Sequence, residues 1–338
     1  MSWPWKGWSP TCEAAMGPER APFPCGAGLP RGPSGPTGPQ PSGARIGLFV
    51  LLYVVAVPLA TAAGEAAAQS LWPLLARWLG VPPWSGTLPE TVGGPVGGQP
   101  GLFALRGLTG LLAVALLTDL FQRGLWRGGR GLRHLGLAGP GAGRELLVGT
   151  LLGGGVMALV VGILCLAGWA TWPAPAPPEA VPRGWGILLL AVGFGLFAAQ
   201  EELIARGFLL QSLAARWPFP AAAAVQAAFF GLAHLANPHA GVASTAGIFC
   251  AGLFFAAAYA RTGRLWLPTG LHIGWNLMEG PMLGLPLSGL RTARFLETHL
   301  TGPVLATGGS FGPEAGLVAA LTLLLATWWL VGRGRRAR

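Results

Sequence analysis

Eight apolar runs, each about as long as a bilayer is thick, leave few possible folds for this chain of 338 residues. A membrane-spanning helix needs about 20 predominantly apolar residues. Only 10% of the residues are charged, and the mean hydropathy is +0.54. We therefore predict an all-α, polytopic transmembrane helix bundle with about eight spans, in contact with the lipid bilayer. The spans are expected at 46–64, 101–121, 147–171, 184–209, 218–236, 243–260, 265–280 and 315–332.

Two segments fall outside these spans. Residues 1–44 are crowded with Pro and Gly and lack the continuous apolar stretch of a signal peptide. This composition predicts a disordered tail in front of a transmembrane domain at 45–338. Residues 71–79 are apolar but too short to cross alone, so we expect them to lie in the interface or to re-enter the membrane.

Arginines gather on one side of the membrane if the eight spans alternate in direction. They follow the second, fourth and sixth spans and close the chain. The positive-inside rule then makes this side cytoplasmic, together with both termini, which predicts an integral protein of the cytoplasmic membrane. Because the basic residues lie in short loops and at the termini, the net charge of +10 does not indicate a nucleic-acid partner. The cysteines lack metal-ligand spacing, so a thiolate metal site is not expected.

Charged side chains inside the fourth span indicate a functional site. Glu201 and Glu202 lie side by side there, and ionisable residues within membrane spans are costly and usually functional. Arg206 follows Glu202 by four residues on the same helical face, which predicts that these two pair and that Glu201 stays free for chemistry. The fifth span adds His234 and, four residues before it, Phe230, which we expect to pack against the site.

A third pair of polar residues lies in the seventh span. His272 and Asn276 are four residues apart and therefore share one helical face. Counting about 1.5 Å per residue from the turn at Trp217, Glu201 and His234 both stand roughly 24 Å along their helices. His272 is only roughly 13 Å from its own turn, so the first hairpin must extend about two turns further for a shared site. We expect Glu201, His234, His272 and Asn276 to line one cavity.

The chemistry that fits this set is hydrolysis of a peptide bond. A carboxylate and an imidazole can deprotonate a water, while a second His and an amide can stabilise an oxyanion. No Ser or Cys with an evident base accompanies the motifs, which favours direct attack by water over an acyl-enzyme. Zn is the alternative cofactor, since two His and a Glu suit it in residue type. The HExxH spacing is absent, and we favour a mechanism with no metal and no cofactor.

The order and spacing of these residues resemble a known family, the CAAX protease and bacteriocin-processing (Abi) family of intramembrane proteases. Three motifs follow one another on successive helices: Glu201-Glu202-x-x-x-Arg206, Phe230-x-x-x-His234 and His272-x-x-x-Asn276. The resemblance covers a core at about 184–280. It implies an all-α bundle with a cavity open to the cytoplasm, and a membrane-associated or peptide substrate.

The resemblance also implies a role for each site residue. Glu201 and His234 would activate the water, and His272 and Asn276 would form the oxyanion hole. The second glutamate and the arginine of the first motif would support the site. Glu279 is expected to be an interfacial carboxylate.

Two interpretations without proteolysis stay open. The chain could be a membrane immunity or scaffold protein on the same fold, or a proton-coupled carrier that uses the acids and histidines as a relay. A carrier predicts paired broken helices and transport coupled to a gradient, and no internal repeat relates the two halves of this sequence. A scaffold predicts that the protein keeps its activity in cells after Glu201→Ala.

Overall fold

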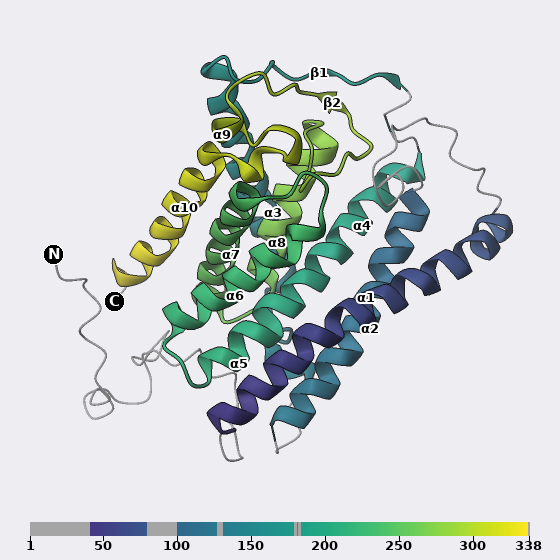
Figure 1. Ribbon diagram of the computed structural model, residues 1–338. Coiled ribbons are helices and arrows are strands. Elements are labelled where there is room, and N and C mark those ends of the chain that lie inside the picture. The colour runs from purple at the N-terminus through teal and green to yellow at the C-terminus, as the bar shows by residue number, and fades with distance from the viewer. Residues whose placement is uncertain (1–40, 80–99, 127–130, 179–180, 182–183, 337–338) are drawn as a thin grey trace.

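The apolar runs of the sequence form long helices in the computed structural model (Figure 1). The structure describes residues 41–79, 100–126, 131–178, 181 and 184–336, so most of the predicted tail at 1–44 lies outside the described residues. The longer helices are α1 (Gly43–Trp78), α2 (Pro100–Leu125), α3 (Ala142–Leu166), α4 (Trp185–Glu202), α6 (Phe219–Ala233), α7 (Val242–Thr262), α8 (Trp266–Leu277) and α10 (Leu317–Arg336).

Short elements link or extend these helices. Two of them are π-helices, η4 (Leu203–Leu209) and η6 (Met278–Met282), which continue α4 and α8. Strands β1 (Ala174–Pro175) and β2 (Leu296–Glu297) pair antiparallel at one end of the bundle, at the top of Figure 1. The others are η2 (Leu132–Leu135), α5 (Leu210–Ala214), η5 (His234–Ala236), α9 (Val304–Thr307), η7 (Gly309–Phe311) and η8 (Pro313–Ala315).

The described residues contain six helices that are long and apolar enough to cross a membrane. They are α1, α2, α3, the run Trp185–Ala214 that starts with α4, the run Phe219–Ala236 that starts with α6, and α7. The last two expected spans correspond to α8 and to the apolar part of α10, which are shorter. These helices establish the predicted all-α bundle and indicate an integral membrane protein.

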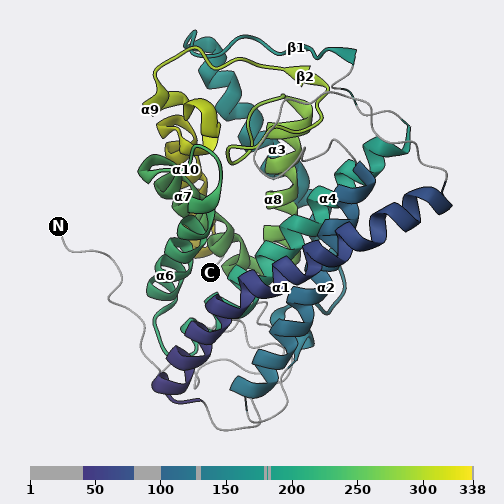
Figure 2. The ribbon, with the colours of Figure 1, turned by 45° about the vertical axis from the view of Figure 1, so that its right-hand side comes forward.

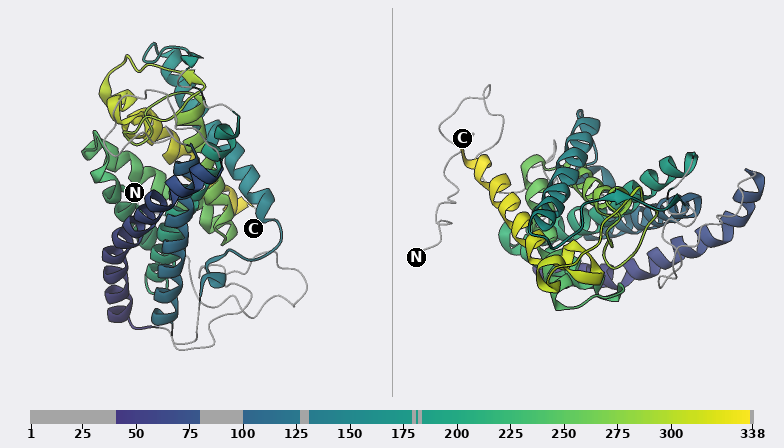
Figure 3. Two further views of the ribbon diagram at one scale, coloured as in Figure 1. Left: turned by 90° about the vertical axis from the view of Figure 1, so that its right-hand side faces the viewer. Right: turned by 90° about the horizontal axis from the view of Figure 1, so that it is seen from above.

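The first helix is longer than the sequence led us to expect. Residues 71–79 were expected to lie apart from the first span, but residues up to Trp78 continue α1 without a break. At about 1.5 Å per residue this helix is roughly 54 Å long, against about 30 Å for the hydrocarbon core. Its last turns project beyond the rest of the bundle (Figures 1 and 3). Pro58 and Pro73 lie inside it, so neither proline ended the helix here.

Helix α8 lies in the middle of the bundle, between α3, α4 and α7 (Figure 2). Its contact with α3 is so close that backbone meets backbone. A Cβ added to Gly274 would lie 1.9 Å from the carbonyl oxygen of Thr150, and one added to Gly153 would lie 2.0 Å from that of Leu271. Small residues are therefore required along this contact. They fix the position of the helix that carries His272 and Asn276.

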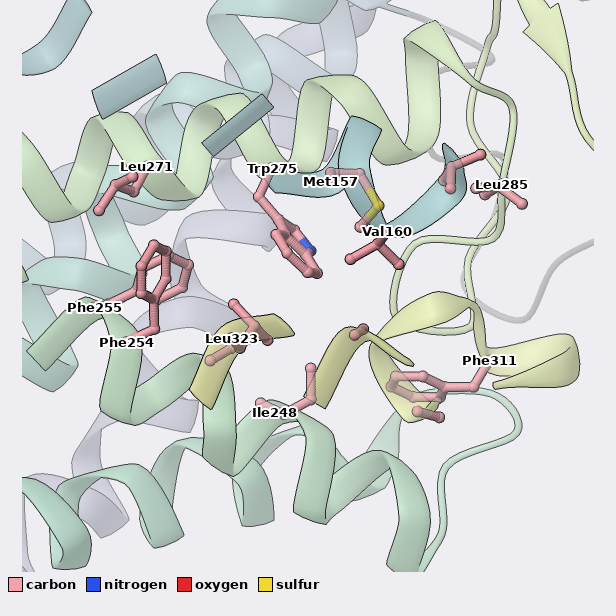
Figure 4. Close-up of a cluster of buried hydrophobic side chains, with 14 of the residues drawn as sticks. Met157, Val160, Ile248, Phe254, Phe255, Leu271, Trp275, Leu285, Phe311 and Leu323 are labelled. Atoms are coloured by element: carbon pink, nitrogen blue, oxygen red, sulfur yellow. The ribbon is translucent and has the colours of Figure 1, made fainter. Parts of the chain in front are cut away.

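Buried apolar side chains fill the space between α3, α7, α8 and α10 (Figure 4). Trp275 points from α8 into this cluster, where Val160 comes from α3, Ile248 from α7 and Leu323 from α10. A second cluster joins α1, α2, α6 and α7. Large apolar side chains also cover the outer surface, among them Leu112 at 60% exposure, as expected for a surface that faces lipid.

Candidate active site

The two acids stand where the helix changes its winding. Helix α4 ends with Glu202, and the π-helix η4 begins at the next residue and carries Arg206. Short π-helical turns within α-helices are rare and frequent at functional sites. The pattern of apolar residues predicted a regular α-helix here, and nothing in it marks the change.

Arg206 and Glu202 form the predicted ion pair. Nη1 of Arg206 lies 2.8 Å from Oε1 of Glu202, and neither side chain is exposed. Nη2 donates a hydrogen bond of 3.1 Å to the carbonyl oxygen of Gly252 on α7. The guanidinium also stacks between two aromatic rings, 4.5 Å from the centre of Phe230 and 5.0 Å from that of Phe255. The charge of Arg206 is therefore compensated from several sides.

His272 is held by Glu202 as well. Its Nδ1 lies 3.0 Å from Oε1 of Glu202, and its ring stacks on Phe255 with the centroids 4.9 Å apart. The carboxylate already accepts from Arg206, so Nδ1 of His272 is the donor in this bond. Only 6% of His272 is exposed. The pair of Glu202 and Arg206 thus fixes the orientation of the imidazole.

His234 is oriented by its own helix end. It is the residue at which α6 passes into the 3₁₀ turn η5, and its Nδ1 lies 2.7 Å from the carbonyl oxygen of Phe230. A carbonyl oxygen only accepts, so Nδ1 of His234 carries a proton and donates it. The Phe230 ring contacts the imidazole edge to face at 5.0 Å, consistent with its predicted role in packing.

Glu201 lies between the two imidazoles. Its Oε2 is 3.9 Å from Nε2 of His234 and 3.8 Å from Nε2 of His272. This oxygen is buried and has no hydrogen-bond partner among the described residues, while the side chain as a whole is 34% exposed. Both distances are too long for a direct hydrogen bond and suit a bridging water. The structure therefore brings three of the four predicted catalytic residues together, from α4, η5 and α8.

Asn276 lies one turn beyond His272 on the same face of α8. Its side chain is half-buried, and its amide makes no hydrogen bond within the part of the chain that the structure describes. An amide with a free N–H group at this position can donate to a molecule that enters beside Glu201.

Three features around the site were not predicted from the sequence. Phe255 and the backbone of Gly252, both on α7, contact Arg206, but no motif marks them. Glu279 was expected to be an interfacial carboxylate, and this was wrong. The residue is fully buried in η6, where its carboxylate lies beside that of Glu314 and close to the indole of Trp275. Its spacing of seven residues from His272, which puts both on one helix face, was the available signal for burial.

No group of three or more His, Cys, Asp or Glu side chains in the described ranges has a geometry that could hold a metal ion. The set proposed from the sequence is Glu201 with the Nε2 atoms of His234 and His272. In a tetrahedral zinc site the ligand atoms lie about 2.0–2.1 Å from the ion, hence about 3.4 Å from one another. The separations of 3.8 and 3.9 Å are wider than this.

Comparison with known families identifies the segment that carries this site. Residues 182–278 match the family model described as type II CAAX prenyl endopeptidase, Rce1-like. The match covers less than half of the chain, and it places this segment in the CAAX protease family that the motifs resemble. No curated protein matches the chain.

Proposed function

We propose that this protein is an intramembrane endopeptidase that hydrolyses a peptide bond with a water activated by Glu201 and His234. The observation that carries the proposal is the position of Glu201 Oε2, 3.9 Å from Nε2 of His234 and 3.8 Å from Nε2 of His272. A carboxylate and two imidazole nitrogens that converge without bonding to one another can hold a reacting water.

The protons fixed on Nδ1 of both histidines support this assignment. In the neutral ring of His234, the proton on Nδ1 leaves Nε2 as an acceptor that faces Glu201. A water between them donates one proton as its oxygen attacks the carbonyl carbon of the peptide. The proton passes to the carboxylate or imidazole and then to the leaving amine, so that one C–N bond breaks and one C–O bond forms.

The oxyanion of the tetrahedral intermediate needs donors on the opposite side. We assign this role to Asn276, through its amide N–H, and to His272, through Nε2–H of the doubly protonated ring. Glu202 accepts from Nδ1 of His272 and thereby stabilises this imidazolium. Arg206 in turn pairs with the Glu202 carboxylate and holds it in place.

The family match supports one substrate class. We propose a membrane-associated peptide or protein, with prenylated CAAX sequences as the first class to test. We further propose that the protein lies in the cytoplasmic membrane with both termini in the cytoplasm, because the arginines follow alternate spans. No cofactor is needed for the mechanism, with zinc as the alternative.

The test uses the full chain purified in detergent and an internally quenched, farnesylated peptide that ends in a CAAX sequence. We expect the wild-type protein to cleave it and Glu201→Gln to abolish cleavage while the protein still folds. Glu65→Gln is the matched control, since Glu65 is a half-exposed acid that pairs with Arg106 between α1 and α2. The same peptide without the prenyl group shows whether the lipid is recognised.

Two outcomes would overturn the proposal. Equal cleavage by wild type and Glu201→Gln would remove Glu201 from the chemistry. If no peptide in the membrane or medium of cells changes by mass spectrometry when active protein is replaced by Glu201→Gln, the protein is not a protease. The immunity, scaffold and carrier interpretations would then replace it.

A further inference from the structure

A third buried acid lies outside the family match and forms a hydrogen bond with the helix that carries part of the site. Glu314 lies in η8, where it is only 7% exposed. Its Oε1 accepts a hydrogen bond of 3.1 Å from the indole N–H of Trp275, and its Oε2 accepts one from the hydroxyl of Ser288. Trp275 is the residue next to Asn276 on α8, and it lies in the cluster of Figure 4. Glu314 therefore bonds directly to the helix that carries the proposed oxyanion hole.

The second branch of this network leads to His234. The carbonyl oxygen of Ser288 accepts a hydrogen bond of 3.1 Å from the side-chain amide of Asn237. Asn237 ends the turn η5 that begins with His234, as expected for a residue before Pro238. Ser288 has a φ of +48°, an uncommon conformation for a residue other than glycine. Such backbone strain persists only where surrounding contacts hold it.

The surroundings leave Glu314 and Ser288 little freedom to move. A Cβ added to Gly247 of α7 would lie 1.7 Å from the carbonyl oxygen of Glu314, so the backbone of η8 rests directly on that helix. Gly289, next to Ser288, donates a backbone hydrogen bond of 2.7 Å to Phe311. A Cβ on Gly289 would lie 2.0 Å from the carbonyl oxygen of Pro238. Three loops are thus packed against one another at the ends of α6 and α8.

We propose that Glu314 is a positioning residue that fixes Asn276 and His234 relative to each other. Through Trp275 it fixes the turn of α8 that carries Asn276. Through Ser288 and Asn237 it fixes the turn that carries His234. The inference rests on the proposed function for its catalytic consequence, whereas the coupling between η5 and α8 stands on the contacts alone. Neither Glu314 nor Ser288 lies within residues 182–278.

A carboxylate is suited to this position because both of its oxygens accept. Glu314 uses one oxygen for each branch, and a glutamine would keep only one acceptor oxygen. Bonds to a charged, buried acceptor are stronger than neutral ones and are costly to lose. Small displacements of catalytic groups reduce rates strongly, by about 100-fold for about 1 Å.

The experiment removes one bond and keeps the packing. Trp275→Phe deletes the indole N–H that binds Glu314 while an aromatic ring remains. Trp266→Phe is the matched control on the same helix, because its indole donates a bond of 3.1 Å to the carbonyl oxygen of Leu137, away from the site. Glu314→Gln and Glu314→Leu complete the set. Cleavage of the farnesylated CAAX peptide and backbone hydrogen exchange are measured for each variant and for Glu201→Gln.

We expect Trp275→Phe to lower kcat by about 10- to 100-fold with little change in KM, since positioning rather than binding is lost. Glu314→Leu should lower kcat further, and Glu314→Gln should restore part of it. Hydrogen exchange should be about tenfold faster in Trp275→Phe and Glu314→Leu at both 234–241 and 270–279. Trp266→Phe should leave kcat and the exchange at 234–241 unchanged.

Unchanged exchange at 234–241 in both Trp275→Phe and Glu314→Leu would overturn the coupling, whatever the activity of the protein. Equal losses of kcat in Trp266→Phe and Trp275→Phe would also overturn it, because any loosening of α8 would then have the same effect. A wild-type protein that does not cleave the farnesylated peptide would refute that substrate class instead. The exchange measurement would still decide whether Glu314 joins the two elements.

Discussion

Arg206 and Glu202 form an ion pair at 2.8 Å inside the bundle, with neither side chain exposed. Glu202 also accepts a hydrogen bond from Nδ1 of His272, so the same carboxylate binds both the buried cation and the imidazole of the proposed site. A buried pair of this kind adds little stability by itself, but each partner depends on the other. A substitution at either residue should therefore change both the stability and the activity of the protein.

Arg206→Ala should therefore destabilise the protein by about 3–5 kcal/mol, because it leaves the Glu202 carboxylate buried without its cation. The rate of cleavage should fall as well, because Glu202 is no longer held in place to orient His272. Thermal unfolding in detergent measures the first effect. The control is Arg123→Ala, which breaks an exposed pair with Asp119 and should change the melting temperature little. Equal shifts for the two variants would contradict the buried pair.

Glu279 offers the opposite case, a buried acid that no cation among the described residues pairs with. It is fully buried, and the nearby carboxylate of Glu314 repels its charged form. Burial of an unpaired ionisable group is costly, so Glu279→Gln should leave the melting temperature in detergent unchanged or raise it. Glu202→Gln, which weakens the pair with Arg206, should lower it. A loss of stability in Glu279→Gln as large as in Glu202→Gln would show that Glu279 has a partner of its own.

Local spacing predicted the pairs that lie within one helix. The interval of four residues from Glu202 to Arg206 was sufficient to predict their contact, even though Arg206 lies in a π-helix. Counting residues from the turn at Trp217 also predicted that Glu201 and His234 stand level with each other, and their side chains approach to 3.9 Å although η4 intervenes. These predictions need only the number of residues between two positions, which can be read from the sequence.

Contacts between distant segments could not be predicted in this way. Glu314 bonds to Trp275 only because η8 rests on Gly247 of α7, and no spacing in the sequence encodes that approach. The pattern of apolar residues does not change at the π-helix η4, so the periodicity of the sequence cannot detect it. Glu279 was placed in the interface because carboxylates usually are, whereas packing around η6 decided its burial. Tertiary packing determines all three features.

The close contact of α3 and α8 predicts a strong effect of one methyl group. A Cβ on Gly274 would lie 1.9 Å from the carbonyl oxygen of Thr150, so Gly274→Ala should push α8 away from α3 and move His272 and Asn276. We expect a loss of stability of about 1–3 kcal/mol and a larger relative loss of cleavage. Gly155→Ala on α3 is the control, since a Cβ there meets nothing within 4 Å. Thermal unfolding and peptide cleavage, compared for both variants, test this, and equal behaviour would refute it.

The proposed division of roles predicts unequal losses of activity. Asn276→Ala removes one of two oxyanion donors, and such a loss typically lowers the rate by about 100- to 1,000-fold. His272 would still donate, so measurable activity should remain. Glu201→Ala removes the base that holds the water and should leave none. Single-turnover cleavage with excess protein separates the two, and equal residual rates would remove Asn276 from the oxyanion hole.

The last prediction concerns the nature of the nucleophile. No Ser or Cys accompanies the three motifs, and the proposed nucleophile is a water activated by Glu201 and His234, so reagents that modify serines or thiols should not block cleavage. The separations of 3.8 and 3.9 Å between Glu201 Oε2 and the two Nε2 atoms are wider than the about 3.4 Å expected around tetrahedral zinc. Purified protein should therefore keep its rate after thorough chelation. If activity is lost completely in chelator and stoichiometric Zn²⁺ restores it, the metal-free mechanism is wrong. His234, His272 and Glu201 would then be the three zinc ligands.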